Sequence, residues 1–404
     1  MTATDLDRPP RIMLVVGEPS GDALGQQVIL ALRALTGGRA DIIGVGGERM
    51  RSAGMQSLYS ITDTSVMGLR EVVPKVPVIL KRIQQVAAFA RDTQPDVVVM
   101  IDSPDFTHKV ARRLRRIAPD MKIVDYVAPQ VWASRPGRAK KMAQYFDHVL
   151  CLLPFEVPFF QGAGMGASFV GHPAVERAPK PGQGEAFRAR HAIPPDARIL
   201  MLLPGSRSSE LRFLWPVFRE AIEMTEREAG SFRIVLPTVQ TVSRKVHDLV
   251  RQWGRDVIVV EDPDDKLGAF DAADVALAAS GTVATELALS ATPMVIGYRV
   301  GALTAAIARR MVRVRYVTLV NLILDREVVP EFIQENCTAP NLSRELVRLL
   351  TNHAARVSQV TASTAALKQM GLGDEPPSLR AAREILRIMK EPRRKPDAAP
   401  ESAS

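Results

Sequence analysis

The hydrophobic positions of the chain fall into short, nearly continuous runs that are separated by amphipathic stretches. The clearest runs are Arg11–Val16, Val97–Ile101 and Val275–Ala279, and each is bounded by turn-forming residues. Runs of this length are typical of strands buried on both faces, and the stretches between them fit covering helices. Strands that alternate with helices in this way predict an α/β fold built on parallel sheets.

The alternating pattern occurs in two series, which predicts two domains of one architecture. The expected strands of the first series are Arg11–Val16, Asp41–Val45, Val97–Ile101, Lys122–Val127 and Asp147–Leu152, and those of the second are Arg198–Leu203, Phe232–Pro237, Asp256–Val260, Asp274–Ala278 and Pro293–Gly297. A length of 404 residues also favours two cores over one. The proline- and glycine-rich stretch between the series is interpreted as a linker. The expected parts are a flexible start at 1–10, a first domain at 11–171, a linker at 172–184, a second domain at 185–341, C-terminal helices at 342–390 and a disordered tail at 391–404.

The composition of the chain indicates which classes of binding partner it favours. A net charge of +9 and a pI of about 9.7 favour an anionic partner, which could be nucleic acid, an acidic membrane surface or a phosphorylated substrate. Aromatic residues make up only 5% of the chain. This argues against a nucleic-acid partner, because surfaces that bind nucleic acid interleave aromatic and basic side chains. Two cysteines indicate a reducing compartment, and no paired His or Cys spacing suggests a metal site.

No part of the sequence predicts export or a membrane span. The first ten residues are polar and lack an apolar core, so they do not fit a secretory signal. No window reaches the roughly 18 uncharged apolar residues that a spanning helix needs. We therefore expect a cytoplasmic protein that is soluble or attached to a membrane surface.

The stretch Val275–Tyr298 contains the first candidate binding site. It fits a strand, a turn at Ser280, Gly281 and Thr282, a helix and a second strand. Free N–H groups at the start of a helix favour an anion, and Glu286 lies one turn beyond Thr282. Two interpretations stay open: an ordinary strand–helix–strand unit, or a nucleotide cradle with the diphosphate at the turn and the ribose at Glu286.

A second candidate turn follows the first strand of the second domain. Gly205 and Ser206 would let the backbone approach a ligand, and Arg207 could bind a phosphate through two N–H groups. The alternative is a helix capped by Ser206 or Ser208, with Arg207 in solvent. Ligands bind at the carboxyl ends of strands in open parallel sheets, so two such turns in one domain favour the phosphate interpretation.

The first domain places acidic and hydroxyl side chains after its strands. Asp102 and Asp105 follow the run Val97–Ile101, and Glu18 and Ser20 follow the first strand. A carboxylate there could act as a general base on a hydroxyl group. Helix capping is the commoner use of Asp, and Asp105 fits a cap better while Asp102 fits a base better.

Val66–Arg82 mixes apolar and basic residues, and its two prolines are expected to break any long helix. Such a segment can lie in a lipid headgroup layer, or it can pack on a core with its lysines in solvent. The apolar residues expected to face lipid are Val66, Met67, Leu69, Val72, Val73, Val76 and Leu80.

Taken together, the motifs resemble those of the lipid-A-disaccharide synthase family. They run in the family's order from about residue 11 to 340: Val16–Asp22, Val66–Val72, Ile101–Phe106, Tyr126–Ala133, Leu153–Glu156, Phe169–Pro173, Leu202–Arg207, Ala279–Glu286, Pro293–Arg299 and Asn321–Ile323. The resemblance implies a GT-B fold, in which two Rossmann-like domains face each other across a cleft. It departs at Ser134, where the family usually has a second tryptophan.

The resemblance implies an inverting glycosyltransferase that joins UDP-2,3-diacylglucosamine to 2,3-diacylglucosamine 1-phosphate (lipid X), without a cofactor or a metal. It implies Asp102 as the base with Glu18 as the alternative, Arg207, Glu286 and Asn321 in the nucleotide half, and Ser20, Asp105 and Gln130 on the acceptor side. It also implies docking on acidic lipids at the cytoplasmic face of the inner membrane, and a C-terminally swapped homodimer. Two alternatives remain: an isomerase of the UDP-N-acetylglucosamine 2-epimerase type, and a non-enzymatic binding protein.

Overall fold

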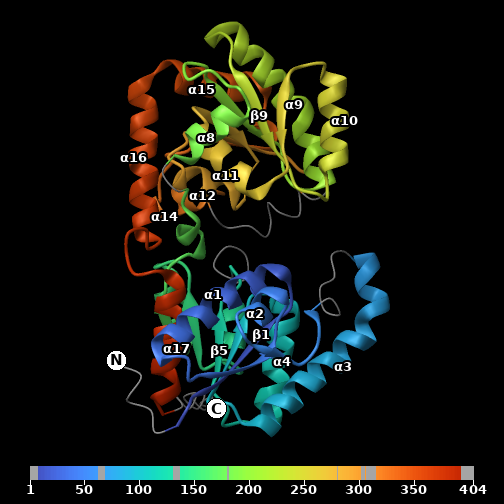
Figure 1. Ribbon diagram of the computed structural model, residues 1–404, viewed down its shortest axis with the longest axis vertical. Helices are drawn as coiled ribbons and strands as arrows, with labels where there is room; N and C mark the ends of the chain where they lie inside the picture. Colours follow the sequence, from blue (N-terminus) through green and yellow to red (C-terminus); the bar gives the residue numbers. More distant parts are fainter. Residues whose placement is uncertain are drawn as a thin grey trace, which may run out of the picture. The chain divides into compact units, whose positions relative to one another are not determined.

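The structure is a computed structural model that describes residues 8–61, 69–130, 137–179, 182–279, 281–301, 305 and 315–392, with only the backbone of 69–75. The chain forms two compact units (Figure 1). Unit 1 takes its described residues from Met1–Pro173 and Gly373–Ser404, and unit 2 is formed by Ala174–Leu372. Each unit contains one parallel sheet with helices around it, which confirms the predicted α/β class.

The sheet of unit 1 has the strand order β3-β2-β1-β4-β5-β6-β7 and is parallel throughout. Its central strands are buried along their whole length because they carry almost only aliphatic side chains. The strands are β1 Arg11–Val16, β2 Asp41–Val45, β3 Gln56–Ser57, β4 Val97–Ile101, β5 Ile123–Tyr126, β6 His148–Cys151 and β7 Gly166–Phe169. The helices are α1 Pro19–Thr36, α2 Glu48–Ser52, α3 Leu69–Thr93, α4 Pro104–Ile117, α6 Gly137–Met142, α7 Glu156–Gln161 and α17 Pro377–Lys390.

The sheet of unit 2 has the order β10-β9-β8-β11-β12-β13 and is also parallel. Its strands are β8 Ile199–Leu203, β9 Arg233–Pro237, β10 Val257–Val260, β11 Val275–Ala278, β12 Met294–Tyr298 and β13 Glu331–Ile333. Its helices are α8 Gln183–Arg190, α9 Ser208–Ala229, α10 Ser243–Trp253, α11 Pro263–Ala272, α12 Val283–Leu289, α14 Leu319–Leu324, α15 Ala339–Thr351 and α16 His353–Gln369, and short 3-10 helices lie at Pro173–Arg177 and Gln334–Asn336.

All ten predicted strands are present, and the described part of the chain contains three further strands that were not predicted from the sequence. The missed strands β3, β7 and β13 lie at the edges of the two sheets. They have two to four residues and no continuous buried run. Hydrophobic runs therefore reveal the central strands and the edge strand β10, and they miss the three short edge strands.

The C-terminal helices divide between the two units. Helix α15 packs on α9 and α16 packs on α12 and α14, so both belong to unit 2. Only α17 belongs to unit 1, where it lies beside α1 (Figure 1). Ala381, Ala382 and Ile385 of α17 are fully buried there. Of the expected helical region 342–390, the last helix alone is thus part of the first unit.

Helix α3 differs from the prediction. Pro74 and Pro77 were expected to break any long helix, but α3 runs unbroken from Leu69 to Thr93, so this expectation is wrong. Proline fixes φ near its helical value and removes one hydrogen bond, and the packing of α3 on α4 can offset that cost. No helix in the described part of the chain is long and apolar enough to cross a bilayer.

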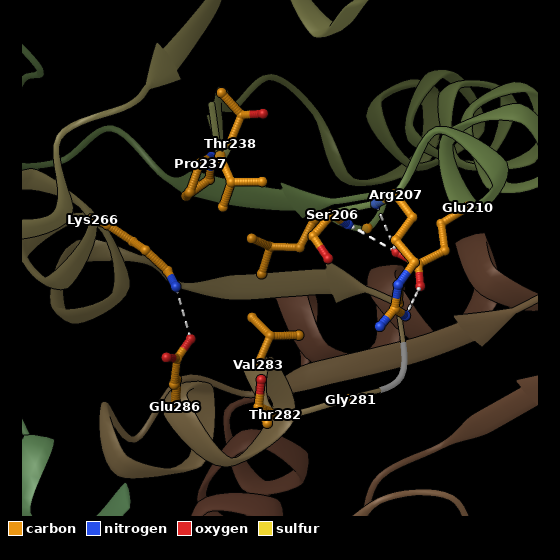
Figure 2. A pocket seen from close by; sticks show the side chains of 14 residues that line it. Ser206, Arg207, Glu210, Pro237, Thr238, Lys266, Gly281, Thr282, Val283 and Glu286 are labelled. Carbon is orange, nitrogen blue, oxygen red and sulfur yellow. Dashed lines mark hydrogen bonds and ion pairs between the residues drawn. The ribbon is translucent and has the colours of Figure 1, made fainter. Parts of the chain in front are cut away.

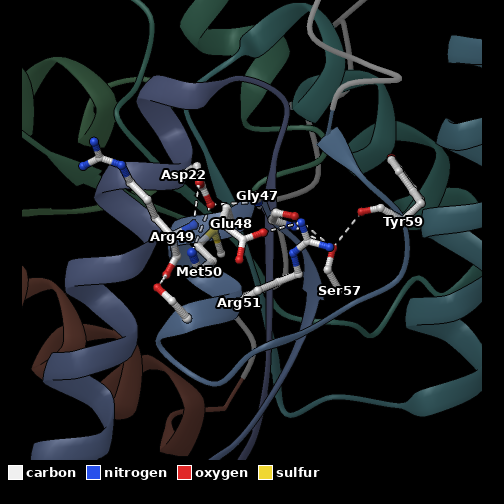
Figure 3. Close-up of polar contacts among 10 residues, drawn as sticks. Asp22, Gly47, Glu48, Arg49, Met50, Arg51, Ser57 and Tyr59 are labelled. Carbon is white, nitrogen blue, oxygen red and sulfur yellow. Dashed lines mark hydrogen bonds and ion pairs between the residues drawn. The ribbon is translucent and has the colours of Figure 1, made fainter.

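Asp22 in α1 holds the start of the next helix in unit 1. Its carboxylate is 5% exposed and accepts hydrogen bonds from the backbone N–H groups of Gly47 (2.7 Å), Arg49 (3.1 Å) and Met50 (3.1 Å), as Figure 3 shows. These donors lie at the N-terminus of α2, where they have no partner within the helix. Asp22 is therefore a structural residue and leaves Glu18 and Ser20 as the candidate site residues of that turn.

Candidate active site

The predicted site residues follow the strands at which the order of each sheet reverses. In unit 1, β1 pairs with β4, and these strands lead into Gly17–Ser20 and Asp102–Asp105. In unit 2, β8 pairs with β11, and these lead into Pro204–Arg207 and the turn after Ala279. Ligands of open α/β sheets bind in the crevice outside such a switch point. Each unit thus places its candidate residues where this kind of sheet binds ligands.

A pocket of about 490 Å³ lies at the switch point of unit 2. Figure 2 shows Arg207 with Glu210 at one side and Lys266 with Glu286 at the other. The volume of this pocket is in the range of sites that bind small molecules. The lining residues are Leu203, Gly205, Ser206, Arg207, Glu210, Pro237, Thr238, Val239, Lys266, Ala279, Gly281, Thr282, Val283 and Glu286.

Glu210, a residue without a predicted role, organises the turn that carries Arg207. Its Oε2 accepts the N–H groups of Ser206 (2.8 Å) and Arg207 (3.1 Å), and its Oε1 accepts Nη1 of Arg207 (3.0 Å). The backbone of this turn was expected to face the ligand, but these two amides are already used. The Arg207 side chain is 76% exposed and keeps further N–H donors for an anion.

Gly205 makes this arrangement possible. Its φ is +108°, a conformation that side chains with a Cβ rarely adopt. A Cβ at this position would lie 2.4 Å from Oε2 of Glu210. Neither Ser206 nor Ser208 caps α9, because Arg207 is the residue before the helix and Glu210 supplies the capping carboxylate.

Glu286 is paired with a lysine on the opposite wall of the pocket. Nζ of Lys266, from α11, lies 2.9 Å from Oε2 of Glu286 in α12. Both side chains are about one-third exposed, at 31% and 29%, so they are in reach of a ligand. The Lys266 ammonium also lies 5.1 Å from the centre of the buried Phe270 ring. Glu286 therefore has a fixed position beside a cation.

The turn between β11 and α12 opens into the same pocket through Gly281 and Thr282. Gly281 has a φ of +143°, and a Cβ there would meet nothing within 4 Å. The third predicted residue of this turn, Ser280, lies outside the described residues. Helix α12 has only seven residues, so the exposed guanidinium of Arg207 supports anion binding more than a helix dipole does.

Asn321 does not line the pocket. It is fully buried, and its Nδ2 donates to the Val329 carbonyl (2.7 Å) and to Glu331 (2.8 Å), while its Oδ1 accepts the N–H groups of Val328 and Val329. All the donors and acceptors of the amide are used within the protein. In this structure Asn321 ties α14 to β13, and it is not among the described residues that line the pocket.

The switch point of unit 1 brings Glu18, Ser20 and Asp102 together. The Ser20 hydroxyl donates a 2.8 Å hydrogen bond to Oδ2 of Asp102. Burial raises the pKa of Glu18, and the negative charges of Asp102 and Asp105 raise it further. In the described part of the chain, none of these three acids pairs with a cation, and no three His, Cys, Asp or Glu side chains are grouped so that they could hold a metal ion.

The backbone at this edge is strained. Asp102 and Ser103 have φ values of +56° and +48°, and Val127, at the end of the neighbouring strand β5, has a φ of +71°. Such values are uncommon outside glycine and are a true outlier for a β-branched residue. Strained residues of this kind gather at functional sites. The strain supports Asp102 as a functional residue. It could not be predicted from local sequence patterns.

The structure also places the remaining predicted residues of unit 1. Asp105 is exposed in the first turn of α4 and does not cap it, because Ser103 holds the cap position without a side-chain bond. Gln130 is exposed after β5. Val76 and Leu80 are 42% and 53% exposed on α3. Val66, Met67 and Ser134 lie outside the described residues, as do the side chains of Leu69, Val72 and Val73.

Two charged residues of the pocket lining, Glu210 and Lys266, were not predicted from the sequence, and only one of them had a local signal. Glu210 stands three residues after the residue that precedes its helix, which is the spacing of a capping carboxylate. Lys266 has no such signal, because its pairing with Glu286 joins two different helices.

Two parallel-sheet units, one with a pocket and the other with a group of acids at its switch point, define a protein of the GT-B fold class. A family model for lipid-A-disaccharide synthetase matches residues 12–376. The lipid-A-disaccharide synthase of Rhodospirillum centenum is 46% identical over 382 residues, which cover 95% of each chain. The chain therefore belongs to the lipid-A-disaccharide synthetase family.

Solved structures of other proteins share the fold. A glycosyltransferase from Rickettsia africae matches with a TM-score of 0.57 at 13% identity, over 95% of this chain and 99% of that one. A UDP-GlcNAc 2-epimerase from Neisseria meningitidis, bound to UDP-GlcNAc, matches with a TM-score of 0.59 at 11% identity, over 93% and 98%. At these identities the likeness concerns the fold alone.

Proposed function

We propose that this enzyme transfers a 2,3-diacylglucosamine residue from UDP to the 6-hydroxyl of 2,3-diacylglucosamine 1-phosphate, with inversion at the anomeric carbon. The products are the β-1′,6-linked lipid A disaccharide 1-phosphate and UDP. The observation that carries this proposal is the family match over residues 12–376, which includes the residues of both switch points.

The donor nucleotide is assigned to the pocket of unit 2. Glu286 offers a carboxylate to the ribose hydroxyls, which are hydrogen-bond donors. Arg207, with Gly281 and Thr282, stands at the side assigned to the diphosphate. When the bond between the anomeric carbon and the UDP oxygen breaks, the leaving group gains negative charge. A fixed guanidinium stabilises that charge more in the transition state than in the ground state.

The acceptor chemistry is assigned to the acids of unit 1. Asp102 takes the proton of the acceptor hydroxyl as its oxygen attacks the anomeric carbon. The hydrogen bond from Ser20 occupies Oδ2, which leaves Oδ1 for the proton. Glu18 is the alternative base, because burial and the charges of Asp102 and Asp105 raise its pKa and so make its carboxylate more basic.

We also propose that unit 1 docks on the cytoplasmic face of the inner membrane. Ile83, Ala87 and Ala90 are buried and lie on one face of α3. Val76 and Leu80 lie at helical spacing on the same apolar face. At Val76 and Leu80 this apolar face is exposed. An apolar helix face beside basic side chains is typical of a membrane-surface helix.

Helix α4 supplies cations for acidic lipids. Lys109, Arg112, Arg113 and Arg116 are exposed at positions that share one helix face, and none pairs with an acidic side chain of the described residues. Each such cation near an anionic leaflet contributes about 1 kcal/mol. Replacing Arg113 and Arg116 by Gln should weaken binding to anionic vesicles about 25-fold on that basis. Equal binding to zwitterionic vesicles, or no change relative to the matched control Arg227→Gln/Arg244→Gln in unit 2, would contradict this part.

The C-terminal helix suggests how two copies could associate. Helix α17 follows the last helix of unit 2 and docks on α1 of unit 1. The same docking onto a second copy would give the swapped homodimer, and light scattering of the purified protein tests it.

The isomerase alternative has less support. The relative at 46% identity carries the synthase name, whereas the epimerase match at 11% concerns the fold alone. The deciding experiment gives the purified enzyme both acyl substrates in detergent and measures UDP and disaccharide. Equal amounts of the two products are expected, whereas UDP without disaccharide, or an epimerised sugar nucleotide, would reject the proposal.

A further inference from the structure

Among the described residues that line the pocket, Lys266 is the one lysine, and it has no assigned role. It comes from α11, whose start is fixed by Asp262, which accepts the N–H groups of Asp264 (2.7 Å) and Asp265 (3.2 Å). Its ammonium contacts Oε2 of Glu286 at 2.9 Å and the face of Phe270. Two fixed helices and a buried ring therefore hold this cation at one wall of the pocket.

The pair has a geometry that suits recognition of a ribose. Lys266 engages one oxygen of the Glu286 carboxylate, and no other described side chain bonds the second oxygen. A carboxylate has about four lone-pair sites, so it can accept two vicinal hydroxyls while it keeps the lysine. Figure 2 shows the pair opposite Arg207, at the end of the pocket away from the cation assigned to the diphosphate.

We propose that Lys266 is a positioning residue for the donor nucleotide: it holds Glu286 in the orientation that accepts the ribose hydroxyls, and it does not bind the phosphates itself. This inference rests on the proposed function, because it takes UDP as the ligand of the pocket. Without Lys266, the carboxylate would lose its fixed rotamer and would have to be ordered when the ligand binds.

Calorimetric titration with UDP and with 2′,3′-dideoxy-UDP tests the proposal. Lys266→Met should weaken UDP binding about five-fold, as expected for a partly exposed ion pair, and should leave dideoxy-UDP binding unchanged. Lys266→Arg should restore much of the loss. In a Glu286→Gln background, Lys266→Met should have no further effect, because the partner through which it acts is gone. In turnover, Lys266→Met should raise the donor KM and leave kcat within two-fold.

A matched control separates positioning from a general loss of structure. Arg255 and Glu226 form an ion pair of similar exposure, 28% and 26%, away from the pocket lining. Arg255→Met should leave the affinity for both ligands unchanged. Lys266→Gln serves as a second variant if Lys266→Met does not fold.

The outcomes distinguish the inference from the function on which it rests. An equal loss for UDP and dideoxy-UDP, or a loss that persists in the Glu286→Gln background, would show that Lys266 contacts the phosphates and would overturn the inference. Wild-type binding of UDP with no effect of Lys266→Met would also reject the inference alone. If the wild-type protein does not bind UDP at all, the proposed function fails and takes the inference with it.

Discussion

Acidic side chains stand at the switch points of both sheets, but their neighbours differ between the two units. In unit 2, Glu210 is bonded to Arg207 and Glu286 is bonded to Lys266. In unit 1, the charges of Asp102 and Asp105 act on Glu18, and the Ser20 hydroxyl donates a hydrogen bond to Asp102. Similar strand edges thus present acids paired with cations in unit 2, and in unit 1 acids that no cation of the described residues pairs with.

This difference separates two kinds of chemistry. In unit 2 each acid is held by a cation. The free N–H groups of Arg207 can then bind an anionic ligand, and the carboxylate of Glu286 can accept the hydroxyl groups of that ligand. In unit 1 burial raises the pKa of Glu18, and the neighbouring charges of Asp102 and Asp105 raise it further, so this group of acids favours binding of a proton. The backbone agrees, because the positive φ values of Asp102, Ser103 and Val127 lie at the edge with the crowded acids.

The largest effect is expected at Asp102. Asp102→Asn keeps the shape of the side chain but removes the base, so kcat should fall by about 10²–10⁴-fold. The affinity for UDP should not change, because the donor pocket lies in unit 2. Steady-state rates and UDP titration measure both quantities. Near wild-type turnover would transfer the role of base to Glu18, and a parallel loss of UDP affinity would break the division between the units.

The next largest effect is expected at Gly205. Gly205→Ala combines a φ of +108° with a Cβ 2.4 Å from Glu210, so the free energy of unfolding should fall by roughly 1–3 kcal/mol and UDP should bind more weakly. The matched control is Gly254→Ala, which has a φ of +69° but no atom within 4 Å of the added Cβ. Guanidinium denaturation should show a smaller loss for the control and unchanged UDP binding. Equal losses in the two variants would show that the turn around Glu210 has no special role.

The smallest effect concerns the pH dependence that Glu18 contributes. Because its pKa is raised in the folded protein, the folded state binds this proton more tightly than the unfolded chain does. The contribution to stability is therefore full below the ordinary pKa of glutamate and is lost as the pH rises through the raised value. Glu18→Gln should remove that loss, as measured by the free energy of unfolding at a series of pH values.

Asp102→Asn sharpens the same test. Removing the Asp102 charge should lower the pKa of Glu18, which burial and the Asp105 charge would then still keep raised. Asp105→Asn should lower it less, because Asp105 is the smaller cause. NMR titration of the Glu18 carboxyl follows these shifts. A pKa that does not respond to either change would mean that the acids of unit 1 do not interact.

The sequence predicted the parts of this comparison that depend on local patterns. Buried runs such as Val97–Ile101 and Val275–Ala278 showed the central strands, and polar residues directly after them showed Asp102, Arg207 and Glu286. The order of strands in each sheet, and hence the two switch points, became visible only in the fold.

What could not be predicted depends on contacts between distant segments. The pairing of Lys266 with Glu286 needs two helices in their final places. The saturated amide of Asn321 depends on β13, an edge strand without a hydrophobic run. The unbroken helix α3 shows that packing can outweigh the local effect of Pro74 and Pro77.

Hydrogen–deuterium exchange of the intact protein with and without UDP tests the central claim most directly, because it reports which unit binds the nucleotide. UDP should slow exchange in the segments 205–210, 237–239 and 281–286 that line the pocket. Exchange in the segments 17–22 and 101–106 of unit 1 should not change. Protection of the unit 1 segments by UDP alone, or protection that misses all three pocket segments, would contradict the assignment of donor binding to unit 2 and proton transfer to unit 1.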